Sequence, residues 1–485
     1  MPAFTDRLLA RLVHVPTGGQ QKAINALERL LATEKPHATL VLKGYAGTGK
    51  TTLVGALVRV QAEAGRPVVL LAPTGRAAKV LSAYAGAPAS TIHRRIYRTA
   101  TDEDGGYGGM SVAPNRERQA LFVVDEASMI GAGGGGTFDR DLLSDLFQYV
   151  FSAPGNKLLL IGDPAQLPPV GSDHSPALDL KDLSARGLLA GTIELTDVVR
   201  QSETSGILAN ATALRSLLAE QGETGTEDAG STGQERPVPQ FITGFDDVVR
   251  VDGHDLQDAL EEAYAKHGDD EVCLICRSNK RAYQYSQQVR ARIHGFEEEL
   301  EANDRLMVVK NNYFWAAREQ DAGSFGLIAN GEQVSVRRVH RTEEKYGLRF
   351  ADLTIDWWDG QADRELEVKV MLDVLGGEGP ALPGLRMRQL SQDVLANIVA
   401  RTKAERFREF KSDPYVNALQ VKYAYAVTCH KAQGGQWKSV FVDQGYVTEE
   451  MIDREYLRWL YTAVTRASEK LYLLNFHPRF YGGND

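Results

Sequence analysis

Residues 44–52, GYAGTGKTT, decide the fold of the first part of this 485-residue chain. They follow the apolar run ATLVLK (38–43) and precede LVGALVRVQAEAG (53–65), whose apolar spacing predicts a helix. The stretch matches G-x-x-x-x-G-K-[ST], the pattern of a loop that binds phosphates between a strand and a helix. Its fixed positions are Gly44, Gly49, Lys50 and Thr51.

Each of these residue types has a task in a phosphate-binding loop. The glycines let backbone N–H groups surround a β-phosphate, Lys50 reaches the β- and γ-phosphate oxygens, and the Thr51 hydroxyl holds Mg²⁺. The following helix directs its positive end at the phosphates. The stretch therefore predicts a nucleotide site. The residues expected to contact the nucleotide are Gly44, Gly47, Thr48, Gly49, Lys50, Thr51 and Thr52.

Four apolar runs in this region predict buried strands. They are TLVLKG (39–44), PVVLLAPT (67–74), ALFVVDEAS (120–128) and KLLLIGDP (157–164). Strands that are apolar at nearly every position are buried on both faces, and their alternation with helical stretches predicts a parallel sheet flanked by helices.

Polar residues follow two of these runs. We expect Asp125 to bind in the Mg²⁺ shell and Glu126 to orient or deprotonate an attacking water; the alternative is a pair that only caps a helix. Asp163 and Gln166 follow the next run, and Gln166 is suited to hydrogen-bond a γ-phosphate. Neither strand end distinguishes an ATPase from a GTPase, but the sequence contains no N-K-x-D guanine signature.

The remaining segments indicate insertions and a second α/β region. The polar, glycine-rich residues 98–119 predict a loop or protruding hairpin, 131–138 a flexible insertion, and 220–240 a disordered surface loop. From about 300 to 410, polar and apolar residues alternate between turns, which predicts a small antiparallel barrel, followed by one helix over 393–412. The chain then returns to α/β character, so a β module inserted into a second α/β domain is the simplest account.

Composition is that of an ordinary soluble protein, with 43% hydrophobic and 25% charged residues. The net charge of −9 argues against an extended basic coat but leaves room for a local groove of Lys and Arg. The N-terminus lacks the apolar core of a signal peptide and no run approaches a membrane span, so we expect a cytoplasmic location and no membrane contact. Cys273, Cys276 and Cys429 are too few for a four-ligand zinc site and predict reduced core cysteines.

Eight short motifs follow one another along the chain. They are GYAGTGKTT, APTGRAAKVLS, STIHRRI, VVDEASMI, GDPAQLPPV, ELTDVVRQ, VTCHKAQG and LYTAVTRAS. Together, in this order, they resemble the motif series of superfamily 1B DNA helicases of the RecD-like group. The likeness spans about residues 15 to 475 and is greatest to the phage Dda type, which is similar in length and keeps GQ before the first strand and T-x-H-K-A-Q-G near the end.

The resemblance assigns roles to residues around the nucleotide. Gln20 matches a glutamine that reads adenine, with Gln21 as the neighbouring alternative. Arg200 and Arg466 match arginines that face the γ-phosphate from the second motor domain. An arginine supplied across a cleft stabilises the charge of phosphoryl transfer, whereas the alternative for each is a surface salt bridge.

The resemblance also implies a single-stranded DNA track and a strand-separating pin. The positions that match DNA contacts are Pro73, Thr74, Thr91, His93, Thr428, His430 and Lys431. A structural role is an equal alternative for the two histidines, and Gln433 is expected to couple the nucleotide and DNA sites. Residues 98–119 match the pin, with Tyr107 and Met110 at its base-facing tip, and a floppy solvent loop is the alternative. The glycine run 131–136 has no counterpart in the Dda pattern.

The implied fold is α/β, with two RecA-like P-loop motor domains, a β-hairpin pin insertion and an SH3-like β-barrel insertion. The expected division is 1–97 plus 120–192 for the first motor domain, 98–119 for the pin, 193–300 plus 412–485 for the second motor domain, and 301–411 for the inserted β module and helix.

The implied activity is that of an ATP-dependent DNA helicase that uses ATP and Mg²⁺ and travels 5′ to 3′. Its expected partners are single-stranded and forked DNA, with single-stranded-DNA-binding, repair or replication proteins, and it is expected to be a monomer. A nucleic-acid-stimulated translocase that remodels protein–DNA complexes without unwinding remains an alternative. A non-enzymatic ATP sensor is disfavoured by Glu126 and the two arginines, and an RNA track stays open because no residue clearly reads a 2′-OH.

Overall fold

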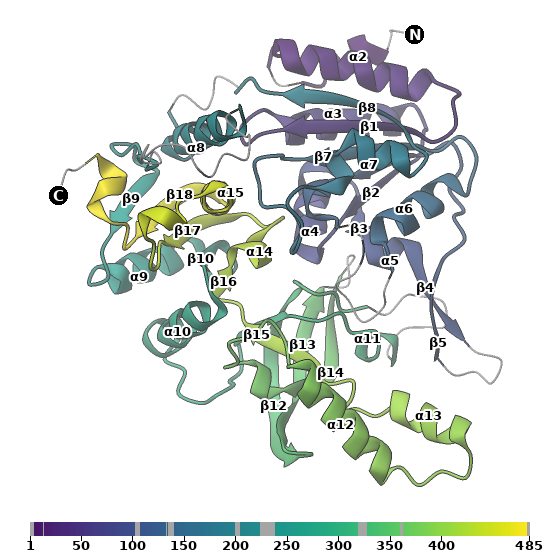
Figure 1. The fold of residues 1–485 in the computed structure, drawn as a ribbon, viewed down its shortest axis with the longest axis vertical. Helices are drawn as coiled ribbons and strands as arrows, with labels where there is room; N and C mark the ends of the chain where they lie inside the picture. The colour runs from purple at the N-terminus through teal and green to yellow at the C-terminus, as the bar shows by residue number, and fades with distance from the viewer. Residues whose placement is uncertain are drawn as a thin grey trace.

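The structure, a computed structural model of the chain, describes residues 4–12, 14–101, 107–131, 133, 140–198, 204–223, 238–318, 327–358 and 362–482. Arg200 lies outside the described residues, as do most of 131–138 and most of 220–240; Tyr107 and Met110 are described in their backbone alone. Figure 1 shows one α/β unit at the upper right, a second at the left, and a β-barrel below them.

The first unit is built on a six-stranded, fully parallel sheet in the order β3-β2-β6-β7-β1-β8. Its strands are β1 (Ala38–Gly44), β2 (Val68–Ala72), β3 (Ala89–Thr91), β6 (Leu121–Val124), β7 (Lys157–Gly162) and β8 (Leu189–Leu195). Four of them confirm the predicted runs, whereas β3 and β8 were not predicted. The sheet also extends past residue 192, where the sequence analysis ends the first motor domain.

Helices cover both faces of this sheet. One face carries α1 (Phe4–Leu9), α2 (Gly18–Ala32), α3 (Lys50–Glu63) and α4 (Gly75–Ala85), and the other carries α5 (Ile92–Ile96), α6 (Leu142–Phe151) and α7 (Leu180–Ala185). Because side chains alternate along a strand, Leu40 and Leu42 pack in the first core and Val41 packs in the second. The continuous apolar runs therefore serve two cores at once.

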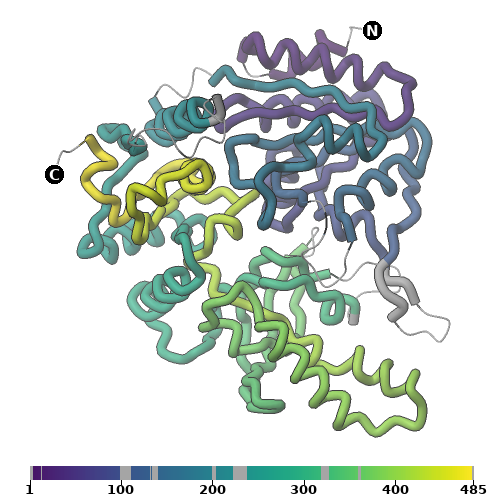
Figure 2. Tube along the Cα trace, in the orientation of Figure 1, coloured from purple at the N-terminus to yellow at the C-terminus, as the bar shows by residue number. Residues whose placement is uncertain are grey.

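A two-stranded antiparallel sheet of β4 (Tyr97–Thr101) and β5 (Tyr107–Val112) stands apart from the six-stranded sheet. Figure 1 shows β4 and β5 at the lower right of the first unit, and Figure 2 traces the course of the chain through the three units in the same orientation. The two strands occupy the segment for which the sequence predicts a protruding hairpin.

The second unit has a five-stranded parallel sheet in the order β16-β10-β17-β18-β9. Its strands are β9 (Val248–Val251), β10 (Val272–Cys276), β16 (Ala426–Thr428), β17 (Trp437–Asp443) and β18 (Ala467–Leu474). Its helices are α8 (Gly206–Glu223), α9 (Leu256–His267), α10 (Asn279–Val289), α14 (Cys429–Ala432) and α15 (Arg454–Val464). Cys273, Cys276 and Cys429 are free and buried in this unit, as predicted.

The third unit is a closed five-stranded barrel. Its strands are β11 (Arg305–Val308), β12 (Gln333–Lys345), β13 (Leu348–Trp358), β14 (Asp363–Met371) and β15 (Leu419–Tyr423), with α11 (Trp315–Arg318) between β11 and β12. Neighbouring strands are antiparallel except for the closing pair β14–β15, which is parallel. The barrel therefore extends past residue 411, where the sequence analysis ends the inserted module. The sequence hides this boundary because the apolar run 419–428 continues from β15 almost directly into β16.

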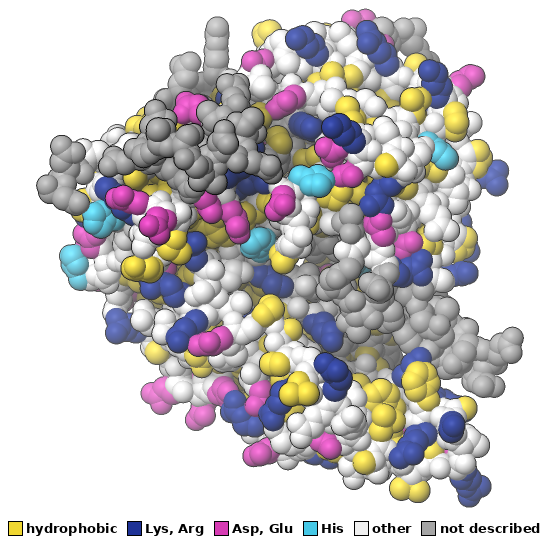
Figure 3. Space-filling model, in the orientation of Figure 1, with side chains coloured by type: hydrophobic (Ala, Val, Ile, Leu, Met, Phe, Trp, Pro, Cys, Tyr) yellow, Lys and Arg dark blue, Asp and Glu magenta, His cyan; other side chains and the backbone are white. Residues whose placement is uncertain are grey.

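The single helix predicted over 393–412 is wrong. The structure has two helices, α12 (Gly384–Asn397) and α13 (Lys403–Lys411), because Ile398 is extended and the Thr402 hydroxyl accepts from the Glu405 N–H (3.0 Å) to begin a new helix. No side chain of α13 is buried. Lys and Arg side chains gather over this end of the molecule (Figure 3). Within the described residues, no helix is both long and apolar enough to cross a bilayer.

Candidate active site

A cavity of about 580 Å³ lies between the two parallel sheets. The first sheet contributes residues that follow the carboxyl ends of β1, β6 and β7, while the second sheet contributes residues that precede β17 or begin β18. The lining includes Tyr45, Gly47, Gly49, Lys50, Thr51, Thr52, Tyr84, Asp125, Glu126, Asp163, Gln166, Gly434, Gln436, Thr465 and Arg466. Parallel strands collect their carboxyl ends at one edge, which is why residues far apart in the sequence meet here.

The predicted phosphate loop joins β1 to α3. Gly47 and Gly49 have φ angles of +74° and +79°, in the left-handed region that glycine adopts without strain. A Cβ on Gly44 would lie 3.0 Å from both the Lys50 side chain and the Thr48 hydroxyl oxygen. The Lys50 ammonium donates to the carbonyl oxygens of Gly44 (2.5 Å) and Tyr45 (2.9 Å). Backbone N–H groups, a lysine and a helix N-terminus thus surround one end of the cavity, a set that fits a polyphosphate.

Gln20 supports this loop from outside the cavity. Its amide nitrogen donates to the Thr48 carbonyl (3.1 Å), and its amide oxygen accepts from the Thr17 N–H (3.1 Å) at the start of α2. The side chain is 1% exposed and does not line the cavity. The adenine-reading role of Gln20 therefore stays a prediction, and the observed role is to fix the loop. Its neighbour Gln21 is more exposed and donates to Asn25 (3.3 Å).

The acidic pair follows β6. Asp125 accepts from the Tyr84 hydroxyl (2.5 Å) with one oxygen and from the Glu126 N–H (2.8 Å) with the other. Glu126 has a φ of +51°, an unfavourable value for a residue with a side chain. Burial raises the pKa of Glu126 to about 6, with Asp125 adding to the rise and Arg466 opposing it. A carboxylate with that pKa is ionised near neutral pH yet basic enough to accept a proton.

The next strand end brings Asp163 and Gln166 to the same cavity. Asp163 accepts from the Ala165 N–H (2.9 Å) and from the Tyr461 hydroxyl (2.7 Å), and burial raises its pKa. Gln166 is 6% exposed, and its amide oxygen has no hydrogen-bond partner within the part of the chain that the structure describes. Buried polar atoms are rarely left unpaired, so this amide is available to a group that enters the cavity.

The second sheet places one cation on the opposite wall. Arg466 is 3% exposed, and its guanidinium donates to the carbonyls of Thr462 (3.0 Å) and Gly435 (3.1 Å) and to the Thr465 hydroxyl (3.2 Å). One guanidinium nitrogen lies 3.9 Å from a Glu126 carboxylate oxygen. Arg466 thus reaches across the cavity toward Glu126, and its role toward a γ-phosphate stays a prediction.

Three further side chains of the second unit bond to the strand ends of the first. The Tyr461 hydroxyl accepts from the Ala46 N–H of the phosphate loop (2.9 Å) while it donates to Asp163. The peptide of Leu167 is held from both sides: its N–H donates to the Thr462 hydroxyl (2.9 Å) and its carbonyl accepts from Gln433 (2.7 Å). Gln433 therefore bonds one unit to the other, and its coupling of the nucleotide and DNA sites stays a prediction. Sequence reasoning missed Tyr461, Thr462 and Tyr84.

The predicted DNA-contacting residues of the first unit lie along the same sheet edge. Pro73 and Thr74 follow β2 and Thr91 ends β3, the neighbouring strand. The hydroxyls of Thr74 and Thr91 accept from backbone N–H groups (3.2 Å each) at the start of α4 and α5. Burial lowers the pKa of His93 to about 4, so its ring is neutral at neutral pH.

The predicted contacts of the second unit lie at the end of β16 and on α14. Thr428 ends β16, and burial lowers the pKa of both His430 and Lys431, that of Lys431 to about 8. The Lys431 ammonium donates to the Asn330 side chain next to the barrel. Just beyond α14, a Cβ on Gly434 would lie 3.4 Å from the Thr74 hydroxyl oxygen. The two predicted DNA surfaces therefore approach each other at this loop.

Arg76 of α4 holds all three units together. Its guanidinium stacks 4.0 Å from the ring centroid of Trp437 and donates to the Gln436 carbonyl (2.8 Å) and to the Gln333 side chain of the barrel (3.1 Å). Burial lowers its pKa to about 10. The residue stands in the second motif, and its partners are far from it in sequence.

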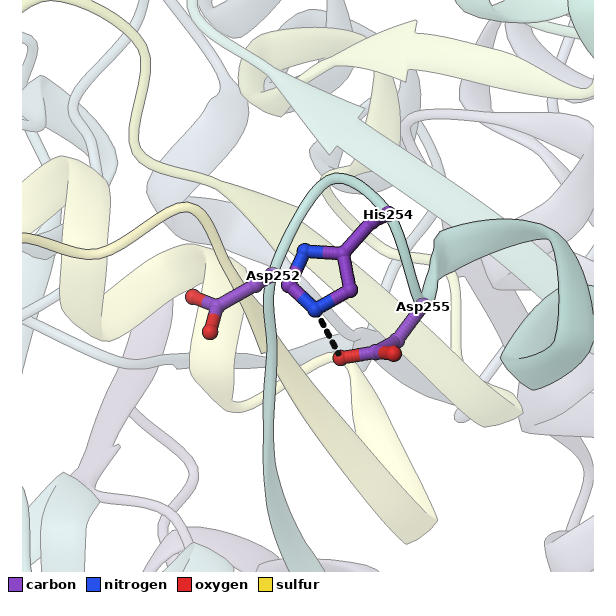
Figure 4. Close-up of side chains that lie close together, drawn as sticks. All are labelled: Asp252, His254 and Asp255. Carbon is purple, nitrogen blue, oxygen red and sulfur yellow. Dashed lines mark ion pairs between the residues drawn. The ribbon is translucent and has the colours of Figure 1, made fainter.

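One cluster of metal-ligand type lies elsewhere among the described residues. Asp252, His254 and Asp255 approach one another in the loop after β9, with His254 3.3 Å from Asp255 (Figure 4). The cluster is mostly exposed and does not line the cavity. The predicted metal residues Thr51 and Asp125 do line it, and they offer oxygen ligands of the kind that Mg²⁺ prefers.

Two family models match the chain. An AAA domain matches residues 17–231, and a UvrD-like helicase C-terminal domain matches residues 423–474. Between them they cover the phosphate loop, the acidic strand ends and the segment that contains Arg466.

Curated relatives match over most of the chain or over its motifs. The chain is 28% identical to the ATP-dependent RecD2 DNA helicase of Deinococcus radiodurans, over 90% of this chain and 47% of that protein. It is 32% identical to the ATP-dependent DNA helicase dda of Enterobacteria phage T4, over 33% of this chain and 34% of that protein. The matched region thus covers less than half of the length of each of these two relatives.

A solved structure of the Pif1 helicase from Bacteroides, in complex with ADP-AlF3 and single-stranded DNA, is similar at a TM-score of 0.42 and 16% identity, over 96% of this chain and 93% of that chain. The family models and the sequence matches together support a likeness of this chain to superfamily 1B helicases of the RecD-like and Dda-like type.

Proposed function

We propose that this chain is an ATP-dependent DNA helicase that hydrolyses ATP in the cavity between its two sheets and moves along single-stranded DNA. One observation carries the proposal. Arg466 from the second sheet lies 3.9 Å from Glu126 of the first, across a cavity whose floor is the phosphate loop. A nucleotide bound there touches both sheets, so hydrolysis changes how they hold each other.

Different residues of the cavity have different tasks in the proposed hydrolysis of ATP. The loop N–H groups and Lys50 hold the phosphates. Thr51 and Asp125 would hold Mg²⁺, which when bound neutralises charge on the β- and γ-phosphate oxygens. Glu126 accepts the proton of the attacking water, and Gln166 orients that water or the γ-phosphate. Arg466 stabilises the charge that develops on the transferred group, with Arg200 proposed as a second arginine.

The bonds between the units transmit the state of the cavity. Tyr461 contacts both the phosphate loop and Asp163, while Thr462 and Gln433 hold the Leu167 peptide, a few residues after Asp163 in the same loop. Loss of the γ-phosphate changes the partners of Arg466 and Gln166, and these bonds carry that change to the second sheet. Repeated closing and opening then becomes stepping along DNA.

The proposed track is a single strand that crosses both sheets. It would contact Pro73, Thr74, Thr91 and His93 on the first and Thr428, His430 and Lys431 on the second. Because His93 is neutral and the hydroxyls are short, these contacts suit a backbone grip without sequence readout. Travel from 5′ to 3′, action as a monomer, and forked DNA with repair or replication proteins as partners are proposals drawn from the family.

The second candidate is a translocase that does not separate strands. The hairpin β4–β5 favours unwinding, because it projects from the first unit and adds nothing to its sheet. The proposed parts are therefore two motor units, a pin that contains β4 and β5, and a barrel that closes with β15 rather than ending at 411.

The test is unwinding of duplexes that carry only a 5′ tail, only a 3′ tail or no tail, with ATP turnover measured in parallel. We expect turnover that single-stranded DNA stimulates and unwinding of the 5′-tailed duplex. The Glu126→Gln protein, prepared in the same way, controls for contaminating helicases. Stimulated turnover without unwinding would favour the translocase, and turnover indifferent to DNA would overturn the proposal.

A further inference from the structure

The Tyr84 side chain occupies a place in the cavity that the proposed chemistry does not use. Tyr84 lies on α4, lines the cavity, and donates its hydroxyl to Asp125 at 2.5 Å. The other Asp125 oxygen accepts from the Glu126 N–H at 2.8 Å. Both oxygens of this carboxylate are therefore held, one by the backbone of its own strand end and one by a neighbouring helix.

Tyr84 is itself fixed against the helix of the phosphate loop. A Cβ on Gly55 of α3 would lie 3.0 Å from the Tyr84 carbonyl oxygen, so α3 and α4 approach closely at this point. The position of the Tyr84 hydroxyl is thus tied to the helix that begins with Lys50 and Thr51. A tyrosine hydroxyl carries its proton at neutral pH, so Tyr84 is the donor in its bond to Asp125.

We propose that Tyr84 is a positioning residue that orients Asp125 for the Mg²⁺ shell. The role rests on the proposed function, in which Asp125 serves the metal. A carboxylate free to rotate must be ordered when the ion binds, whereas one held at both oxygens presents its remaining lone pairs in a fixed direction. Partners of this kind, one step removed from the ion, commonly change metal affinity by about 10- to 100-fold when they are lost.

The experiment compares Tyr84→Phe with the wild-type chain in a Mg²⁺ titration. Binding of a fluorescent, non-hydrolysable ATP analogue is followed as Mg²⁺ is raised from zero. We expect the Mg²⁺ concentration at half-maximal response to rise by about 10-fold, with analogue binding in excess EDTA unchanged. Excess Mg²⁺ should restore ATP turnover, because the proposed base and arginine are intact.

Tyr97→Phe is the matched control. The Tyr97 hydroxyl also donates to a buried aspartate, Asp145, at 2.8 Å, but neither residue lines the cavity. This variant loses the same kind of bond from the same unit, so its Mg²⁺ midpoint should equal that of the wild type. Circular dichroism and Tm of both variants establish that the exchanges leave the fold intact.

Three outcomes overturn the role. An unchanged midpoint in Tyr84→Phe would mean that Tyr84 only packs against Asp125, and a lower midpoint would mean that its hydroxyl competes with the ion. In both cases the proposed function stands if the wild type needs Mg²⁺. A wild-type chain whose nucleotide binding ignores Mg²⁺ would overturn the proposed use of Asp125, and the role of Tyr84 with it.

Discussion

Each parallel sheet has an aspartate at the carboxyl end of an inner strand, and the two are held in different ways. Asp443, wholly buried at the end of β17, accepts from the Arg281 guanidinium at 2.5 and 2.7 Å and from the Tyr285 hydroxyl at 3.0 Å. Asp125, after β6, accepts only from Tyr84 and a backbone N–H, and no cation among the described residues pairs with it. Asp443 is paired with a cation, whereas both donors to Asp125 are neutral, which favours the proposed use of the Asp125 charge by an ion.

The two sheets also turn opposite edges to the cavity. The first presents the carboxyl ends of β1, β6 and β7, where loops can carry the chemistry. The second presents the starts of β17 and β18 and contributes Arg466. Similar architecture therefore does not imply a similar task, and substitutions at equivalent places should separate the two. The following expectations run from the largest effect on ATP turnover to the smallest.

The first comparison is between two lysines that each stand in the first turn of a helix after a strand. Lys50→Ala should reduce turnover by about 10³-fold or more, because a fixed positive contact to the reacting phosphates is lost. Lys280→Ala, in α10 of the second sheet, should leave turnover within about twofold, since Lys280 is exposed and pairs with Glu378 at the surface. Steady-state turnover of both proteins checks this, and near-normal turnover in Lys50→Ala would disprove the assignment of the nucleotide site.

Glu126→Gln should bind ATP and DNA normally but turn over about 10³-fold more slowly, because it keeps the shape and loses the base. The wild-type rate should fall about tenfold per pH unit below pH 6, since the base must be ionised and its pKa is about 6. Because the pKa of Glu126 in the folded chain lies above the ordinary 4.5, the folded chain binds this proton more tightly than the unfolded chain does. The free energy of unfolding therefore falls as the pH rises from about 4.5 through 6. Rate and stability should therefore change in opposite directions over that window, and the acid limb of the rate should vanish in Glu126→Gln.

The two aspartates give the most direct contrast. Asp125→Asn should lose about 10²-fold in turnover with little change in Tm, because its charge serves the ion rather than the fold. Asp443→Asn should keep turnover but lose about 2 kcal/mol of stability, since it leaves the partly exposed Arg281 without its counter-charge. Turnover and thermal unfolding of the pair decide the matter. The reverse pattern would mean that the donors around a strand-end aspartate do not reveal its role.

Two tyrosines, one from the cavity and one beside Asp443, should differ in the same way, with a smaller effect on turnover. Tyr461→Phe removes the bonds to Ala46 and Asp163 that join the units, and we expect DNA-stimulated turnover to fall about tenfold, equivalent to about 1.4 kcal/mol. Tyr285→Phe removes a hydroxyl from Asp443, which keeps Arg281, so turnover should not change. The ratio of turnover with and without single-stranded DNA is the measurement. Equal ratios in the two variants would exclude Tyr461 from coupling.

Replacement of residues 100–117 by a short Gly-Ser linker should leave turnover near normal and uncouple unwinding. The hairpin in this segment adds no strand to the first sheet. Each base-pair step that opens costs about 1.4 kcal/mol, so loss of a wedge should show most on long or GC-rich duplexes. Displacement of streptavidin from a biotinylated single strand should persist, as a control for translocation. Wild-type unwinding by this variant would assign strand separation to another element.

The spacing of residues in the sequence was enough to predict the parts of the site whose residues are close together along the chain. The phosphate loop, the acidic pair and the strands that position them were predictable, because each depends on neighbours within a few residues. Tyr84 and Tyr461 were not, because their aspartates are 41 and 298 residues away. The apolar pattern of a helix does not reveal which distant strand end its tyrosine hydroxyl will contact.

Some residues for which the sequence predicts a ligand contact also have a structural role in the fold. Gln20 uses its amide to hold the phosphate loop and to begin α2. Thr74 and Thr91 use their hydroxyls to begin helices. Such double use arises because short polar side chains after a strand are also good helix caps. Their substitution would change stability as well as any contact with DNA.

The barrel interrupts the second sheet, and this has a consequence for synthesis. All strands of the first sheet have been synthesised by Leu195. In the second sheet β9 pairs with β18, so Val248 cannot pair until Leu471 has been synthesised. Closing so long a loop is entropically costly and slow, and the β14–β15 pair of the barrel must also close around α12 and α13. On the ribosome, the phosphate loop is therefore assembled while Arg466 is still unmade. During that interval the nascent chain carries one wall of the cavity, with the phosphate loop and Glu126, but not yet the opposite wall with Arg466.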